Sequence, residues 1–310
     1  MTFGVRTRRG AYAALVALTV IWGANWTAMK MALAHADPVS FNLQRTWIAV
    51  VVLFAVLIAR RRPLLPASWI AVIVTGLFQT TINFGSTTMA LAGGAPGRTS
   101  VLVFTMPFWT MLIAWPVLGE RVRGAQWLAI ALALAGLVLL VAPWDWRGDL
   151  APRLWAVLSG FGWAAGTVAT KYYSRERDLD MLNFIAWQML VGVLPLSLLP
   201  FAMTLPATDW SVTQVVLLVQ VGVVSTALGF LLWIEALRLL PAGTASLNMF
   251  AIPVIALVLS MIVYGERLAP AEWTGIGCIG GGLAIVTWRA LRASRQGGAA
   301  PLEPTPADGG

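Results

Sequence analysis

The sequence predicts an all-α membrane protein with ten transmembrane helices, arranged as two inverted five-helix repeats. Hydrophobic residues make up 59% of the chain and charged residues only 11%, whereas a soluble domain usually carries about 25% charged residues. Uncharged stretches such as 11–29 and 124–144 reach the roughly 20 residues that span a bilayer. In addition, the second half of the chain repeats the pattern of the first.

Apolar stretches bounded by charges, prolines or glycines define the ten predicted helices. The first stretch follows Arg6, Arg8 and Arg9 like a secretory leader, but it continues to Lys30 without a small-residue cleavage site, so we interpret it as a spanning helix. The predicted helices cover residues 11–33, 39–59, 67–92, 97–118, 124–142, 153–173, 180–201, 211–239, 244–264 and 271–290.

These helices divide the chain into four parts. Residues 1–10 form a cytoplasmic N-terminus, 11–142 the first repeat, 153–290 the second repeat, and 291–310 a cytoplasmic tail. Glycines, prolines and the lack of aromatic residues predict that this tail is disordered.

The distribution of basic residues predicts that both termini face the cytoplasm. With a cytoplasmic N-terminus, fifteen basic residues fall in cytoplasmic segments, and only Arg98, Arg147, Arg153 and Arg267 lie on the opposite side. Cytoplasmic loops of membrane proteins carry the excess of lysine and arginine. The sequence therefore predicts a multi-pass protein of a bacterial inner membrane.

Matching residues define the two repeats. Residues 22–30 (WGANWTAMK) match 163–171 (WAAGTVATK), and from the third helix onward Gly119-Glu120-Arg121 matches Gly265-Glu266-Arg267. Because each repeat contains five spans, the second copy enters the membrane in the opposite orientation. Inverted repeats are typical of secondary transporters, which bind their solute near the middle of the membrane between the repeats.

A family resemblance rests on these same segments. Residues 21–26 (IWGANW) with Lys30, the paired Gly-Glu-Arg segments and the five-plus-five layout resemble the drug/metabolite transporter superfamily, specifically its EamA-type members, over residues 10–290. The spans rich in tryptophan and methionine look most like the YddG-type exporters. The resemblance implies export of aromatic and other neutral amino acids by alternating access.

Polar and aromatic residues inside the apolar spans are the candidates for a solute cavity. Trp22, Asn25, Trp26 and Met29 share one face of the first helix, and a polar stripe that includes Thr87 runs along the third. Such groups need protein partners or a water-filled cavity, so helix packing is the alternative interpretation. The predicted substrate-binding residues are Trp22, Asn25, Trp26, Gln79, Thr80, Asn83, Thr105, Trp109, Trp163, Thr167, Ser246 and Asn248.

A second group of residues has predicted gating or charge roles: Lys30, Lys171, Pro107, Pro253 and Glu235. The lysines either extend to water at the membrane surfaces or act as gate cations that attract a carboxylate. The prolines are hinges or harmless kinks, and Glu235 couples protons or pairs with Arg238.

Three further expectations concern residues outside these groups. Arg45 lies well inside the second span, and we expect it to extend outward or to pair with a neighbouring helix. Gly136, and Gly277 with Gly281, are expected to be close-packing surfaces.

Other classes of function find less support. A single histidine, a single cysteine and no HExxH segment argue against an enzyme, a metal site or a cofactor. The net charge of +8 is scattered between apolar spans, which argues against nucleic acid binding. An exporter of a drug cation, a nucleotide precursor or an organic anion stays open, and a channel or receptor is less favoured. The expected partners are a small-molecule substrate and the lipid bilayer, with a monomer as the working assumption.

Overall fold

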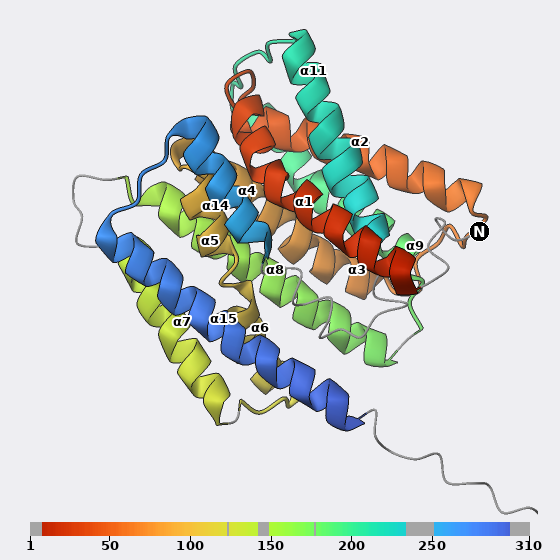
Figure 1. Ribbon diagram of the computed structural model, residues 1–310. Helices are drawn as coiled ribbons and strands as arrows, with labels where there is room; N and C mark the ends of the chain where they lie inside the picture. Colours follow the sequence, from red (N-terminus) through yellow and green to blue (C-terminus); the bar gives the residue numbers. More distant parts are fainter. Residues whose placement is uncertain (1–7, 123, 142–148, 177, 234–250, 298–310) are drawn as a thin grey trace, which may run out of the picture.

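The computed structural model in Figure 1 describes residues 8–122, 124–141, 149–176, 178–233 and 251–297. Over these residues the chain is α-helical without strands, as the composition predicts. Six of its helical segments are long and apolar enough to cross a membrane: Gly10–Ala32, Pro38–Ala59, Trp69–Gly93, Pro96–Leu118, Met181–Ala202 and Val212–Trp233. Ala125–Val141 and Ala251–Tyr264 are shorter apolar helices, so the count of ten spans stays a prediction.

In the first repeat, two of the five predicted spans are subdivided. The third contains a π-helical stretch, and the fourth is broken by a turn. The elements are α1 Arg8–Ala32, α2 Pro38–Ala59, α3 Trp69–Gly76, the π-helix η1 Leu77–Ile82, α4 Asn83–Gly93, α5 Pro96–Val103, α6 Met106–Leu118 and α7 Ala125–Val141.

The second repeat is described except for residues 177 and 234–250. It comprises α8 Ala151–Glu176, α9 Met181–Ser197, α10 Leu199–Ala202, α11 Val212–Val219, the π-helix η2 Gln220–Leu228, α14 Ala251–Tyr264 and α15 Pro270–Gly297. Helix α15 therefore continues past residue 290, where the disordered tail was expected to begin, and residues 298–310 lie outside the described part of the chain.

The third span of each repeat contains a π-helix at matching positions. From the third span onward, matching residues of the two repeats lie 146 residues apart, as Gly119 and Gly265 do. Moved by this offset, the residues of η1 fall inside η2. The glycine before or within each π-helix is a close crossing point: a Cβ on Gly76 would lie 2.6 Å from the Gln188 carbonyl oxygen, and one on Gly222 would lie 3.0 Å from the Arg45 carbonyl oxygen. π-helices are rare and are often found at functional sites.

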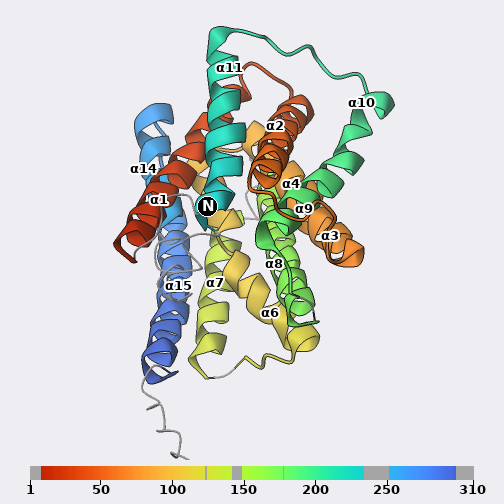
Figure 2. The ribbon, with the colours of Figure 1, turned by 90° about the vertical axis from the view of Figure 1, so that its right-hand side faces the viewer.

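Helices α7 and α15 pack side by side and antiparallel at one edge of the bundle (Figures 1 and 2). Gly136 of α7 approaches Gly275 near the start of α15, whereas Ala129 faces Gly282 further along it. The segments that precede these two helices, with Glu120 and Glu266, therefore lie at opposite ends of the bundle. This arrangement supports inverted repeats.

Cysteine labelling can test that inversion in the membrane. In a Cys278→Ser background, we expect Arg121→Cys to react from the cytoplasmic side and Arg267→Cys from the external side, because both side chains are exposed beside segments at opposite ends of the bundle. Labelling of both positions by an impermeant reagent from the same side would contradict the inverted arrangement.

Candidate functional site

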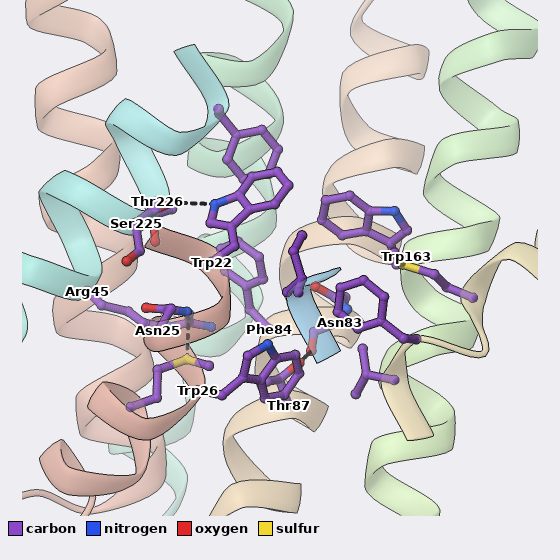
Figure 3. Close-up of a pocket in the computed structure, with 16 residues that line it drawn as sticks. Trp22, Asn25, Trp26, Arg45, Asn83, Phe84, Thr87, Trp163, Ser225 and Thr226 are labelled. Carbon is purple, nitrogen blue, oxygen red and sulfur yellow. Dashed lines mark hydrogen bonds between the residues drawn. The ribbon is translucent and has the colours of Figure 1, made fainter. Parts of the chain in front are cut away.

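A cavity lies between the two repeats. Figure 3 shows its lining side chains, which come from α1, α2 and α4 and the α5–α6 break of the first repeat, and from α8, the third span and α14 of the second. Five residues predicted to bind substrate line it: Trp22, Asn25, Trp26, Asn83 and Trp163. Both repeats therefore contribute residues to the wall of one cavity.

Aromatic rings form much of the cavity wall. The Trp22 indole Nε1 donates to the Ser225 carbonyl oxygen over 2.9 Å, and the Trp22 ring lies edge-on to Phe230 at a centroid distance of 6.0 Å. Phe230 also contacts Trp163, at 6.1 Å. A Cβ at position 229 would lie 2.5 Å from Trp22 Nε1, so the glycine there leaves room for the indole. The aromatic wall is thus held by contacts across the repeats.

A polar cluster holds α4 to α8 beside the cavity. The Asn83 side-chain nitrogen donates to the carbonyl oxygen and to the hydroxyl of Ser159, each at 2.9 Å. The Thr87 and Ser159 hydroxyls lie 2.6 Å apart. Asn83 therefore lines the cavity and also fixes the helix that carries Trp163, a structural role that its position in the polar stripe did not reveal.

Arg45 is buried, with 3% of its surface exposed, and lines the cavity. Its Nε donates to Asn42 Oδ1 over 3.0 Å, one terminal nitrogen lies 3.4 Å from the Met29 sulfur, and its Cζ lies 4.4 Å from the centre of the Phe84 ring. Of the two alternatives expected for Arg45, the structure therefore shows contact with neighbouring helices and not extension outward. Asn42 and the two helices facing α2 instead hold the guanidinium inward.

The other predicted substrate-binding residues lie outside this cavity where the structure describes them. Gln79 Nε2 donates to Thr167 Oγ1 over 3.2 Å. Trp109 Nε1 donates to Thr105 Oγ1, also over 3.2 Å, so both side chains form a hydrogen bond within the fourth span. Thr80 is buried beside Gly192 of α9. Ser246, Asn248 and the predicted gating residue Glu235 lie outside the described residues.

The two lysines with predicted gating roles have protein partners. Lys30 Nζ donates to the carbonyl oxygens of Leu91 and Ala92, at 2.6 and 3.1 Å, near the end of α4, where helix carbonyls lack partners within the helix. Lys171 Nζ lies 2.7 Å from Glu120 Oε1. Neither ammonium group lines the cavity.

Of the two prolines with predicted gating roles, Pro107 lies at a helix start. The chain turns at Phe104 and Thr105, and Pro107 stands in the first turn of α6, so the predicted span 97–118 is two helices rather than one kinked helix. Proline is favoured in a first turn because the amide hydrogen that it lacks has no partner there. Pro253 lies in the first described turn of α14, and residues 244–250 lie outside the described chain.

The paired Gly-Glu segments share one backbone shape but have different surroundings. Gly119 and Gly265 adopt left-handed φ values of 68° and 63°, a conformation that glycine tolerates at helix ends. The following Glu266 has only 2% of its side chain exposed, against 40% for Glu120. The repeat symmetry is therefore broken at these two ends of the bundle.

Glu266 caps the N-terminus of α5. Its two carboxylate oxygens accept from the Gly97 and Arg98 amide nitrogens, each at 3.1 Å, and the Ser260 hydroxyl also donates to it. Arg98 Nε lies 3.3 Å from the same carboxylate. This contact fastens the α14–α15 connection of the second repeat to the fourth span of the first.

Several cavity residues were missed by the sequence analysis. Phe84, Phe230 and Arg45 all line it. Among these, only Arg45 carried a signal in the sequence, because a charged residue deep in an apolar span is usually functional. Over the described residues, no group of three or more His, Cys, Asp or Glu side chains could hold a metal ion.

Comparison with known proteins gives consistent matches along the chain. The profile of the EamA-like transporter family matches residues 9–142 and, again, 151–288. The "Uncharacterized transporter YoaV" of Bacillus subtilis (strain 168) is 26% identical over 82% of this chain and 88% of its own length. A "Probable amino-acid metabolite efflux pump" of Salmonella typhimurium is 24% identical over 94% of this chain and its own full length.

A solved crystal structure supports the same fold. It superposes with a TM-score of 0.63 at 21% identity, over 91% of this chain and 99% of its own.

Proposed function

Because this chain belongs to the EamA-like transporter family, we propose that it is a secondary transporter that exports aromatic and other neutral amino acids by alternating access. The family consists of membrane transporters rather than enzymes, and the matched relatives are bacterial transporters. The observation that carries the proposal is the aromatic cavity between the repeats. The name of the Salmonella typhimurium relative supports export of amino-acid metabolites.

The walls of the cavity suit a solute with an aromatic or thioether side chain. Aromatic pairs contribute about 0.5–1.5 kcal/mol beyond the area that they bury, and Trp22, Trp26, Phe84 and Trp163 all line the space. The organic-anion alternative loses the two lysines as cavity cations, since their ammonium groups bind protein oxygens elsewhere.

The unequal ends of the bundle support alternating access. One Gly-Glu segment is buried against the opposite repeat through Glu266, while the matching Glu120 is partly exposed beside Lys171 and Arg175. A transporter with inverted repeats exchanges such roles between its two states, because the repeats give two related arrangements of similar energy. The cavity between the repeats can then open to either side.

Counterflow in proteoliposomes tests the proposed function directly. Proteoliposomes loaded with unlabelled phenylalanine are expected to take up labelled phenylalanine and methionine faster than protein-free liposomes. Labelled lysine and a quaternary amine are expected to enter at the rate seen with protein-free liposomes. Exchange restricted to the quaternary amine would overturn the amino-acid proposal in favour of a drug-cation exporter.

Trp163→Ala is expected to raise the KM for phenylalanine about ten-fold, because the solute ring loses a large aromatic partner. Trp155→Ala is the matched control, since Trp155 lies on the same helix, is 38% exposed and does not line the cavity. Initial rates in the counterflow assay measure both. An unchanged KM for normally expressed Trp163→Ala would remove this residue from the solute site.

A further inference from the structure

Among the residues that the structure describes, Arg45 has no counter-ion in the cavity. It is also the only charged side chain among the sixteen described residues that line this space. A charged side chain within a membrane protein is costly unless it is paired or reaches water. Only a weak sulfur acceptor, one amide oxygen and the face of Phe84 contact the guanidinium in the described structure.

The hydrogen bonds of this guanidinium are incomplete. Arginine carries five N–H donors in a planar fork that matches a carboxylate. Nε has a partner, one terminal nitrogen has the Met29 sulfur, and the other, NH2, is buried without any partner among the described residues. A buried donor of this kind costs free energy until an acceptor arrives. A solute carboxylate is an acceptor of the right charge.

The repeat architecture does not require this charge. Asn42 has its repeat mate in Asn183, but at the same offset of 141 residues Arg45 corresponds to Ala186, which is fully buried. A guanidinium that served only to hold the second helix of a repeat would be expected in both copies. Its presence in one copy gives the cavity a cationic side in the first repeat.

Asn25 supplies an unpaired acceptor on the same wall. Its side-chain oxygen is buried and has no hydrogen-bond partner among the described residues. Asn25 lies one helical turn before Met29, the α1 residue whose sulfur contacts Arg45, so the amide and the guanidinium face the cavity from neighbouring positions (Figure 3). An acceptor without a donor is the complement of an ammonium group.

We infer that Arg45 and Asn25 together recognise the α-carboxylate and the α-ammonium group of a zwitterionic amino acid. The unpaired NH2 of Arg45 donates to the carboxylate, and the Asn25 side-chain oxygen accepts from the ammonium group. The solute side chain then lies against the tryptophans of the cavity. This inference rests on the proposed transport function and adds to it the chemical group that each residue binds.

Truncated ligands test the pair on the unaltered protein. Phenethylamine lacks the carboxylate of phenylalanine, and 3-phenylpropionate lacks its ammonium group, while both keep the ring. We expect each to compete with labelled phenylalanine at least about ten-fold more weakly than phenylalanine itself, because each leaves one buried group unpaired. Equal competition by phenethylamine would overturn the role of Arg45, and equal competition by 3-phenylpropionate that of Asn25.

Variants then assign each group to its residue. Arg45→Gln should raise the KM for phenylalanine at least about ten-fold while changing the inhibition constant of phenethylamine less than two-fold, since that ligand has no carboxylate to lose. Asn25→Ala should reduce the preference for phenylalanine over 3-phenylpropionate. Arg61→Gln, an exposed position just beyond α2, is the matched control and should leave both values unchanged. Equal weakening of phenylalanine and phenethylamine by Arg45→Gln would assign this arginine to packing and overturn the inference.

The proposed function and the inference can fail separately. Unaltered protein that exchanges phenethylamine as well as phenylalanine is still a transporter, but the recognition pair is then wrong. Unaltered protein that exchanges no amino acid overturns the proposed function and the pair with it. Should Arg45→Gln not fold, Arg45→Lys and the ligand series on unaltered protein still decide, because the truncated ligands need no variant.

Discussion

Replacing Glu266 with glutamine is expected to destabilise the protein by about 3 kcal/mol, since hydrogen bonds to a buried charged group are the strong ones. Its two carboxylate oxygens accept from the amides of Gly97 and Arg98 at the start of α5. Glutamine keeps one acceptor but places an NH2 group where the second acceptor stood, and it removes the negative charge that a helix N-terminus favours. Unfolding in mixed micelles, followed by circular dichroism, measures the loss.

The repeat itself provides the control for this prediction. Glu120→Gln is the same substitution at the matching position, where the carboxylate is 40% exposed beside Lys171 and Arg175. Exposed ion pairs contribute about 0–1 kcal/mol. Equal losses in the two variants would show that Glu266 is no more important to stability than its exposed counterpart, and that its contact with α5 does not fasten the two repeats.

The sequence predicts the positions of the helices well, because long apolar runs leave few other structures for a chain in lipid. It did not predict the break in the fourth span. Pro107 indicated a kink, but the turn at Phe104 and Thr105 also depends on the Thr105 hydroxyl, which donates to the Leu102 carbonyl oxygen over 2.7 Å. Side-chain bonds of this kind compete with the helix only where neighbouring helices leave them room.

The cavity was predictable only in part. The shared face of α1 indicated Trp22, Asn25 and Trp26, and repeat symmetry indicated Trp163, all of which line it. For Arg45 the sequence left two directions open, outward or toward a neighbouring helix, because the choice depends on Asn42 beside it and on the helices opposite. Which residues meet across helices depends on tertiary packing, which a single span's pattern does not contain.

The packing glycines of α15 show the same limit. Gly277 and Gly281 were predicted to face a neighbour, but a Cβ on Gly277 would meet nothing within 4 Å and one on Gly281 only a single side-chain atom at 4.0 Å. Gly275 and Gly282 make the close contacts instead. They are seven residues apart and so share a helix face. In a helix this rich in glycine, the sequence alone cannot indicate which face is turned toward α7.

That geometry leads to a large expected effect at the α7–α15 contact. A Cβ on Gly136 would lie 2.4 Å from the Gly275 carbonyl oxygen and 3.1 Å from the Ile279 amide nitrogen, which are backbone atoms that cannot turn aside. Gly136→Leu should therefore separate the helices and destabilise the protein by about 3 kcal/mol. Gly277→Leu adds the same side chain on the open face of α15 and should change the unfolding midpoint little. If Gly136→Leu unfolds in mixed micelles at the midpoint of Gly277→Leu, then the close contact between α7 and α15 does not hold the two repeats together.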